Sequence, residues 1–394
     1  MNNVSVLYRA ELRKIFAKKA VWIATILGLI FILLVSLSNF YSEVTRAYFK
    51  YEKDTLLTIS GQKMDEAFFE EYRNVIEREL EVHPERYEKI YEIDPGAVFM
   101  NAASNVGMYA LYSYIYSTVR DINVIPSLTA AEFYEAMRYG IELEGFELGS
   151  SKQEIDEWLE IFDSVDLPIA YSYAMAYRLI VDGLYIIGWI LVLIIAIALS
   201  GVFADEKTYR TDALVLSSKN GRIPVCIAKI FSGITFAVLE TIILLGAGSG
   251  IMFLFYGTTG WKAMIQNVIP SSPWNITIGN MVLIYLGLAI LLSAFFAVTN
   301  LILSHMTKSA VATMAIHAAI IFVGLFNMPG KFGFIAKIWQ LRPTIVLYSK
   351  TFCNTYMYGG FNNVQITAIL YMSLTILFAV ILVLSYKKSQ VESR

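Results

Sequence analysis

Two ionisable side chains inside long apolar runs, Glu240 and His317, are the residues of this sequence best placed to do chemistry. A carboxylate at Glu240 would help to move a proton or an ion, or would form a hydrogen bond between two helices, and the sequence leaves both open. For His317 we favour the packing role. Asp182 and Asn300 complete the candidates for an intramembrane path, but the sequence has no chain of several carboxylates through the apolar runs.

Motifs for catalysis and for nucleotide binding are missing from the sequence. It contains no G-x-x-x-x-G-K-[ST] loop for phosphates, and neither H-E-x-x-H nor G-x-S-x-G occurs. Its histidines and cysteines are not grouped at metal-ligand spacing. We therefore expect that the chain is not an enzyme, that it holds no metal and no cofactor, and that it has no nucleic acid partner.

The composition is typical of a membrane protein with one polar domain. Hydrophobic residues make up 57% of the 394 residues and charged residues 16%, whereas a soluble protein has about 25% charged residues. Residues 41–178 contain 26 acidic and 12 basic residues, and the rest of the chain contains 7 acidic and 19 basic residues. We expect an acidic domain attached to a basic membrane body.

Six apolar runs are long enough to cross a bilayer, since about 18 mainly apolar residues suffice for a helix. The fold class expected is therefore an all-α integral membrane protein with six transmembrane helices. We place these spans at residues 20–40, 179–203, 230–256, 281–303, 309–328 and 366–386.

Lysine and arginine residues in the short loops predict the orientation in a cell (plasma) membrane. Basic clusters lie in residues 1–19, in the 204–229 loop and in the 387–394 tail. If these clusters are cytoplasmic, both termini are inside and the 41–178 domain is extracellular. Residues 329–365 oppose this pattern, because they are then also outside and carry four basic residues, but the strong bias around the first span outweighs them.

Local patterns predict helices outside the spans. In residues 1–19, apolar residues recur every four positions from Val4 to Phe16, which favours an amphipathic helix in the cytoplasmic interface. The 41–178 domain contains two capping-box patterns, Thr129-x-x-Glu132 and Ser151-x-x-Glu154, so we expect it to be mainly helical. Only one proline interrupts residues 152–203. We therefore expect the last helix of the 41–178 domain to lead directly into the second span.

A charged segment, residues 204–217, separates the second and third spans. It combines charges of both signs with an aliphatic patch from Leu214 to Leu216. A short helix of this kind is suited to docking in a groove of another protein, whereas a solvated connector would need no aliphatic patch. For such a docking helix we expect Glu206 and Arg210 to be exposed.

The order of elements and the first cytoplasmic loop point to a known family. An interfacial basic helix is followed by a span, a large outside domain and five further spans, and the loop carries Phe203-x-x-Glu206, Thr211-Asp212-x-Leu214-x-Leu216-Ser217-Ser218 and Gly221-Arg222. In these features the sequence resembles the permease subunits of bacterial ABC-2-type ABC transporters. The resemblance covers the membrane body but not the 41–178 domain.

The resemblance implies that the loop contains a coupling helix that inserts into a separate ABC ATPase subunit, which would bind ATP and Mg²⁺. The turn between the fourth and fifth spans would make a second contact. It also implies a re-entrant helical hairpin within residues 329–365 and a second permease chain, identical or paralogous, embedded with this one among membrane lipids. The residues it would assign to ATPase coupling are Asp205, Glu206, Lys207, Arg210, Thr211, Asp212, Leu214, Leu216, His305 and Lys308.

Other functions remain compatible with the sequence. A membrane sensor or immunity subunit could use the same fold without moving a substrate across the membrane. An ion-driven secondary carrier would instead depend on Glu240 and not on ATP. For an exporter, the substrate could be a peptide or antimicrobial, a lipid-linked molecule or a cation.

Overall fold

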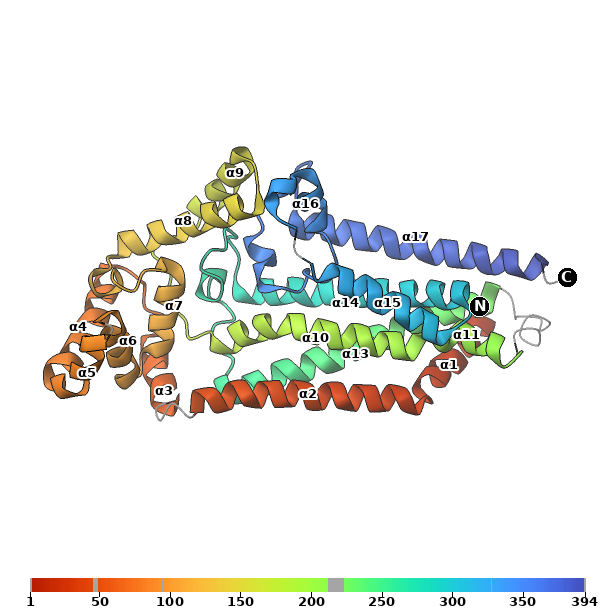
Figure 1. Ribbon diagram of the computed structural model, residues 1–394, viewed down its shortest axis with the longest axis horizontal. Helices are drawn as coiled ribbons and strands as arrows, with labels where there is room; N and C mark the ends of the chain where they lie inside the picture. Colours follow the sequence, from red (N-terminus) through yellow and green to blue (C-terminus); the bar gives the residue numbers. More distant parts are fainter. Residues whose placement is uncertain (1, 45–48, 94, 212–222, 327, 393–394) are drawn as a thin grey trace.

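The computed structural model describes residues 2–44, 49–93, 95–211, 223–326 and 328–392. Figure 1 shows an elongated molecule in which a bundle of long helices carries a compact helical domain at one end. The first helix and the end of the last helix both lie at the opposite end of the bundle. The described part of the chain is therefore mainly helical, as the sequence predicts.

Five described helices are long and apolar enough to cross a membrane. A shared core of buried residues that includes Phe236, Leu244 and Leu301 holds them together, while large apolar side chains such as Leu27 and Ile243 are exposed on the outside of the bundle. An exposed apolar surface of this kind suits contact with lipid. The five are α2 (Lys19–Val44), α10 (Met175–Leu199) with its continuation α11 (Gly201–Thr208), α13 (Ile223–Tyr256), α14 (Ile278–Thr307) and α17 (Asn363–Glu392).

The predicted span 309–328 corresponds to a shorter apolar helix, α15 (Ala310–Gly324). Its 15 residues measure about 22 Å, less than the roughly 30 Å of a bilayer core. The helix ends where Arg342 Nε and Thr344 Oγ1 donate hydrogen bonds to the Gly324 carbonyl, at 2.8 and 2.7 Å. Five spans are therefore supported by helix length, and a sixth crossing stays a prediction.

The loop predicted at 204–229 is partly helical. The second apolar helix continues as α11 to Thr208, and α13 begins at Ile223 rather than at Ile230. Helix α1 (Asn2–Phe16) packs along the first turns of α13, where Tyr8 donates to Thr235 at 3.1 Å and Phe16 meets Phe236 edge to face. One end of the bundle is thus a junction of several helix ends.

The helical domain has a core of its own, separate from that of the bundle. Buried residues such as Phe69, Ile76 and Phe133 form this core, and both predicted capping boxes, at Thr129 and at Ser151, are confirmed. Its elements are α3 (Phe49–Ile59), α4 (Glu66–Val82), η1 (Pro84–Arg86), α5 (Glu88–Ile93), α6 (Pro95–Asn105), α7 (Tyr109–Val119), η2 (Ile125–Ser127), α8 (Ala130–Leu148) and α9 (Lys152–Asp163). We call it the α3–α9 domain.

The expectation that the last helix of this domain leads directly into the next span is wrong. Helix α9 ends at Asp163, and α10 begins only at Met175. Between them, residues 169–171 run in extended form beside residues 61–64, with main-chain hydrogen bonds of 2.8–2.9 Å. Main-chain N–H and C=O groups of residues 169–171 form hydrogen bonds with residues 61–64 and are therefore not available to continue a helix.

The bundle is closed near the α3–α9 domain by residues 328–362, which we call the cap. Its elements are η4 (Gly330–Phe332), α16 (Phe334–Trp339), η5 (Ser349–Cys353) and an antiparallel pair of short strands, β1 (Met357–Tyr358) and β2 (Phe361–Asn362). With one six-residue α-helix, the described cap does not contain the predicted hairpin of two helices. The remaining connection, between α13 and α14, contains η3 (Ile265–Asn267).

Two ion pairs fasten the cap to the α3–α9 domain. Lys337 Nζ lies 2.5 Å from Glu154 Oε1, and Lys350 Nζ lies 3.0 Å from Glu144 Oε1. Burial alone would raise the pKa of Glu154, but hydrogen bonds from Lys337 and main-chain N–H groups outweigh this effect and leave the pKa below its ordinary value.

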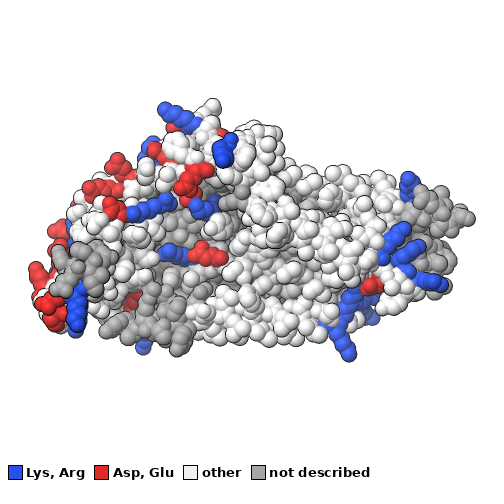
Figure 2. Space-filling model, in the orientation of Figure 1, with Lys and Arg blue, Asp and Glu red and all other residues white. Residues whose placement is uncertain are grey.

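Charges are concentrated at the two ends of the molecule. In Figure 2, acidic side chains gather over the α3–α9 domain, basic side chains gather at the opposite end, and the surface between them is uncharged. This is the separation that the sequence predicts for a domain, a membrane-embedded bundle and a basic cytoplasmic end.

Candidate functional site

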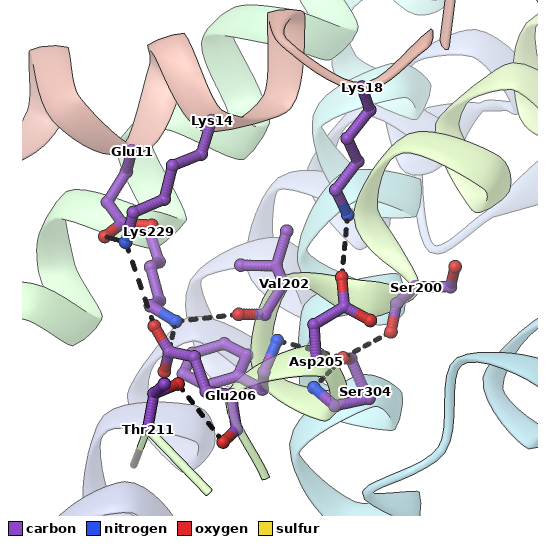
Figure 3. Close-up of polar contacts among 12 residues, drawn as sticks. Glu11, Lys14, Lys18, Ser200, Val202, Asp205, Glu206, Thr211, Lys229 and Ser304 are labelled. Atoms are coloured by element: carbon purple, nitrogen blue, oxygen red, sulfur yellow. Dashed lines mark hydrogen bonds and ion pairs between the residues drawn. The ribbon is translucent and has the colours of Figure 1, made fainter. Parts of the chain in front are cut away.

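The candidate site is the junction around α11, where α1, α13 and α14 also meet (Figure 3). We call it the α11 junction. Helix α11 is only eight residues long and has little intrinsic stability in isolation. Its position therefore depends on what its neighbours contribute.

Ser304 of α14 fixes the start of α11. Its hydroxyl oxygen accepts hydrogen bonds from the N–H groups of Phe203 and Ala204, both at 3.2 Å, and donates to the Ser200 carbonyl at 2.5 Å. N–H groups in the first turn of a helix have no partner within that helix. A side chain of another span thus satisfies them and ties α11 to α14.

Lys229 of α13 holds the inner side of α11. The side chain is fully buried, and its ammonium group lies 2.7 Å from Glu206 Oε2 and donates to the Val202 carbonyl at 2.7 Å. The same group lies 4.4 Å from the centre of the Phe203 ring, in a cation–π arrangement. A buried charge is tolerated only when it is paired and hydrogen-bonded, as here.

Helix α1 and Lys18, which lies between α1 and α2, make the outer contacts of the junction. Lys18 Nζ lies 3.3 Å from Asp205 Oδ2, and Lys14 Nζ lies 2.6 Å from Glu11 Oε1 and 3.9 Å from Glu206 Oε1. A groove of about 470 Å³ separates α1 from α11 and is lined by these charged side chains together with Tyr209 and Thr211. Any displacement of α11 therefore acts on α1, α13 and α14 together.

The predicted coupling residues divide into two groups. Glu206 was expected to be exposed, and that is wrong, because its side chain is 15% exposed and pairs with Lys229. Arg210 is exposed as predicted, and Lys207 and Thr211 are also exposed. The inner group is packed against neighbouring helices, and the outer group is exposed.

The remaining residues predicted for ATPase coupling lie after α11 or near the end of α14. Asp212, Leu214 and Leu216 fall outside the described residues. In the turn after α14, Lys308 is exposed at the helix end, whereas His305 packs between the rings of Phe203 and Tyr386. Of the two residues assigned to this second predicted contact, Lys308 therefore presents its side chain outward and His305 does not.

The intramembrane candidates do not come together among the described residues. Glu240 is buried, with Thr25 of α2 as its hydrogen-bond partner and Oε1 without one in the described chain. Asn300 and His317 face each other at 3.4 Å between α14 and α15. Asp182 lines a different cavity, with Arg178. Separate polar contacts between helix pairs fit packing better than one continuous path.

Sequence reasoning missed the side chains that position α11. Lys229 reads as the last basic residue of a loop, and Ser304 as the start of a turn. The one available signal is a single lysine between Ala228 and Ile230 in an otherwise apolar run. Such a residue needs a counter-ion, but the sequence does not say that Glu206 supplies it.

Within the described parts of the chain, no group of three or more His, Cys, Asp or Glu side chains could hold a metal ion. The α11 junction places charged side chains at the end of a bundle of apolar helices.

Long apolar helices with a polar junction at one end define the class, a multi-pass membrane protein. The family model described as ABC-2 family transporter protein matches residues 5–391, and the chain belongs to this family as an ABC-2-type permease. The match includes the α3–α9 domain, which the resemblance from sequence motifs does not cover. No curated protein and no solved structure matches the chain significantly.

Proposed function

We propose that this permease is the membrane subunit of an ATP-driven exporter and that α11 couples it to a separate ABC ATPase subunit. The observation that carries the proposal is the division of α11 into two sides. Lys229 and Ser304 hold its inner side against two long apolar helices, while Lys207 and Arg210 are exposed at the end of the bundle. A push on the exposed side would be transmitted to the spans.

The mechanism follows from how α11 is attached. The ATPase subunit would bind ATP and Mg²⁺, since this chain has no phosphate-binding loop and, in this proposal, no catalytic role. Closure of the ATPase would move α11, and the buried Lys229–Glu206 pair would carry the movement to α13. Because α10 continues into α11 with Ser200 between them, the same movement would tilt α10.

The orientation and the assembly complete the proposal. The basic end with α1, α11 and the end of α17 would be cytoplasmic, and the acidic α3–α9 domain would be extracellular. Two permease chains, identical or paralogous, would enclose the path within the lipid bilayer. Export of a peptide or antimicrobial, a lipid-linked molecule or a cation is compatible with this arrangement.

The experiment compares charge reversals at two exposed bases. Arg210→Glu changes an exposed base two residues after the end of α11, and Lys262→Glu changes an exposed lysine in the connection between α13 and α14, far from α11. Each variant is purified from its native membrane in mild detergent, and the accompanying proteins are identified by mass. We expect a stoichiometric ATPase with the parent and with Lys262→Glu, and loss of most of it with Arg210→Glu.

Full retention of the ATPase in Arg210→Glu would contradict the coupling role of α11. A chain that purifies without any ATPase would contradict the proposal as a whole. Movement of a substrate across vesicle membranes on addition of ATP distinguishes an exporter from a sensor or immunity subunit of the same fold.

A further inference from the structure

A cavity of about 520 Å³ lies at the end of the bundle next to the α3–α9 domain, away from the α11 junction. We call it the chamber. The end of α8, the cap, α10 and the first residue of α17 form its walls. It is large enough for a polar headgroup and several water molecules.

The chamber lining includes a buried amide oxygen, that of Asn363, to which no described group donates a hydrogen bond. Asn363 is 5% exposed, and its Oδ1 atom has no hydrogen-bond partner in the described chain. Leaving a buried acceptor without a partner is unfavourable. A bound molecule that donates a hydrogen bond to Asn363 Oδ1 would satisfy it.

The charges that line the chamber balance. Two carboxylates, Glu144 and Glu147, and two bases, Arg342 and Lys350, contribute to its walls. Lys350 binds both oxygens of Glu144 at 3.0 Å, and Arg342 donates to the carbonyl oxygens of Gly324 and Trp339. A ligand with one net charge would meet as many like charges as opposite ones, whereas a zwitterion would match both signs.

An apolar crevice adjoins the chamber at Tyr185, which lines both. The crevice is narrow, about 30 Å³, and its walls include Trp189, Leu292 and Leu347. Tyr185 lies ten residues after the start of α10, which corresponds to about 15 Å along the helix. The crevice therefore lies alongside the apolar part of the bundle, where a hydrocarbon chain would be.

We propose that the chamber and crevice together bind one zwitterionic amphiphile that has an ammonium group in its head, with the charged head in the chamber and the start of a hydrocarbon chain in the crevice. Asn363 Oδ1 accepts a hydrogen bond from the head, and Tyr185 lies at the boundary between head and chain. The binding itself does not depend on coupling to an ATPase. Whether the bound molecule is cargo rests on the proposed function.

The test measures binding of three dioleoyl lipids by native mass spectrometry. Their heads are phosphoethanolamine, which is zwitterionic and can donate hydrogen bonds through its ammonium group, phosphoglycerol, which is anionic, and trimethylammonium, which is cationic. The protein is purified in maltoside detergent with any accompanying subunits. We expect one phosphoethanolamine lipid per chain, bound at least about tenfold more tightly than the other two. Equal binding of the three lipids would overturn the proposal.

Two variants with matched controls locate the site. Asn363→Ala removes the unpartnered amide, and Gln340→Trp fills the chamber, which Gln340 also lines. Asn280→Ala and Gln153→Trp are the same changes at exposed positions. We expect about tenfold weaker phosphoethanolamine binding in Asn363→Ala, loss of binding in Gln340→Trp, and no change in the controls.

Unchanged binding in both chamber variants would overturn the location. The headgroup ranking uses the unaltered chain, so it decides the ligand class even if a variant does not fold. In vesicles that contain the ATPase complex, ATP-dependent transfer of the labelled lipid between leaflets identifies cargo, and binding without transfer identifies a resident lipid. If the chain is not part of an ATP-driven exporter, the transfer of the lipid will be absent but its binding will remain.

Discussion

Replacing Lys229 by methionine is the sharpest test of the α11 junction, because it removes a charge and keeps most of the side-chain volume. The ammonium group supports α11 through Glu206, the Val202 carbonyl and the Phe203 ring, at 2.7, 2.7 and 4.4 Å. Removing one partner of a buried ion pair typically costs 3–5 kcal/mol, because the other charge is left without compensation. We expect Lys229→Met to lower the free energy of unfolding by about that amount.

The double variant Lys229→Met/Glu206→Gln separates stability from coupling. It removes the uncompensated carboxylate, so most of the lost stability should return, to within about 1–2 kcal/mol of the parent. The Val202 carbonyl and the Phe203 ring still lack their cation. We therefore expect hydrogen exchange of the α11 amides to stay faster than in the parent and stimulation of the ATPase to stay low.

Unfolding in denaturant, hydrogen exchange over residues 201–208 and ATPase activity of the reconstituted complex measure these effects. Lys14→Met serves as the control, since Lys14 is 59% exposed and its ion pairs should contribute about 0–1 kcal/mol. Our reasoning is refuted if Lys229→Met is as stable as Lys14→Met. It is also refuted if the double variant is no more stable than Lys229→Met alone.

Three further predictions concern the cap and the bundle. The pKa of Glu154 lies below its ordinary value of 4.5, so its contribution is present at neutral pH and is lost as the pH falls below that value. The protection of the cap amides, measured relative to their intrinsic exchange rate at each pH, should then fall, and unchanged protection at pH 3 would count against the ion pair. Gly149→Ala should destabilise the protein by about 2 kcal/mol or more, because φ is +78° and a Cβ atom would lie 2.8 Å from the Gly330 carbonyl oxygen. Gly359→Ala also has positive φ but no atom within 4 Å, and equal losses of unfolding free energy would disprove this contact. Glu240→Gln should keep ATP-driven transport in vesicles if the carboxylate only packs against α2. Loss of transport with normal ATPase stimulation would favour the ion-driven carrier instead.

Periodic features of the fold could be predicted from the sequence because they are local. Apolar runs long enough to span a bilayer and the capping boxes at Thr129 and Ser151 need only neighbouring residues for their recognition. The sequence did not predict where a helix ends when a segment distant in the chain determines that end. Helix α15 ends at Gly324 because residues of the cap bind its carbonyl, and residues 164–174 leave the helix for pairing with residues 61–64.

The candidate site could be predicted only as a segment. The mixed charges around α11 indicated a docking helix, but they did not indicate which charges face inward. Glu206 and Arg210 look equivalent in the sequence, yet one pairs with a buried lysine and the other is exposed. The difference arises from Lys229, whose approach depends on how α13 packs against α11, and no local pattern encodes that packing.

The attachments at the two ends of the bundle have a joint consequence for how the permease can move. At one end, Ser304 and Lys229 tie α11 to α14 and α13. At the other end, ion pairs tie the cap to the α3–α9 domain, and the cap binds the end of α15. Interiors packed in this way repack between discrete arrangements and do not deform continuously. A push on α11 that tilts the spans must therefore also move the cap relative to the α3–α9 domain or carry both together. Because Glu144 of the α3–α9 domain, Lys350 of the cap and Tyr185 of α10 all line the chamber, either movement would change its shape, so in the proposed mechanism ATPase closure would reach the chamber.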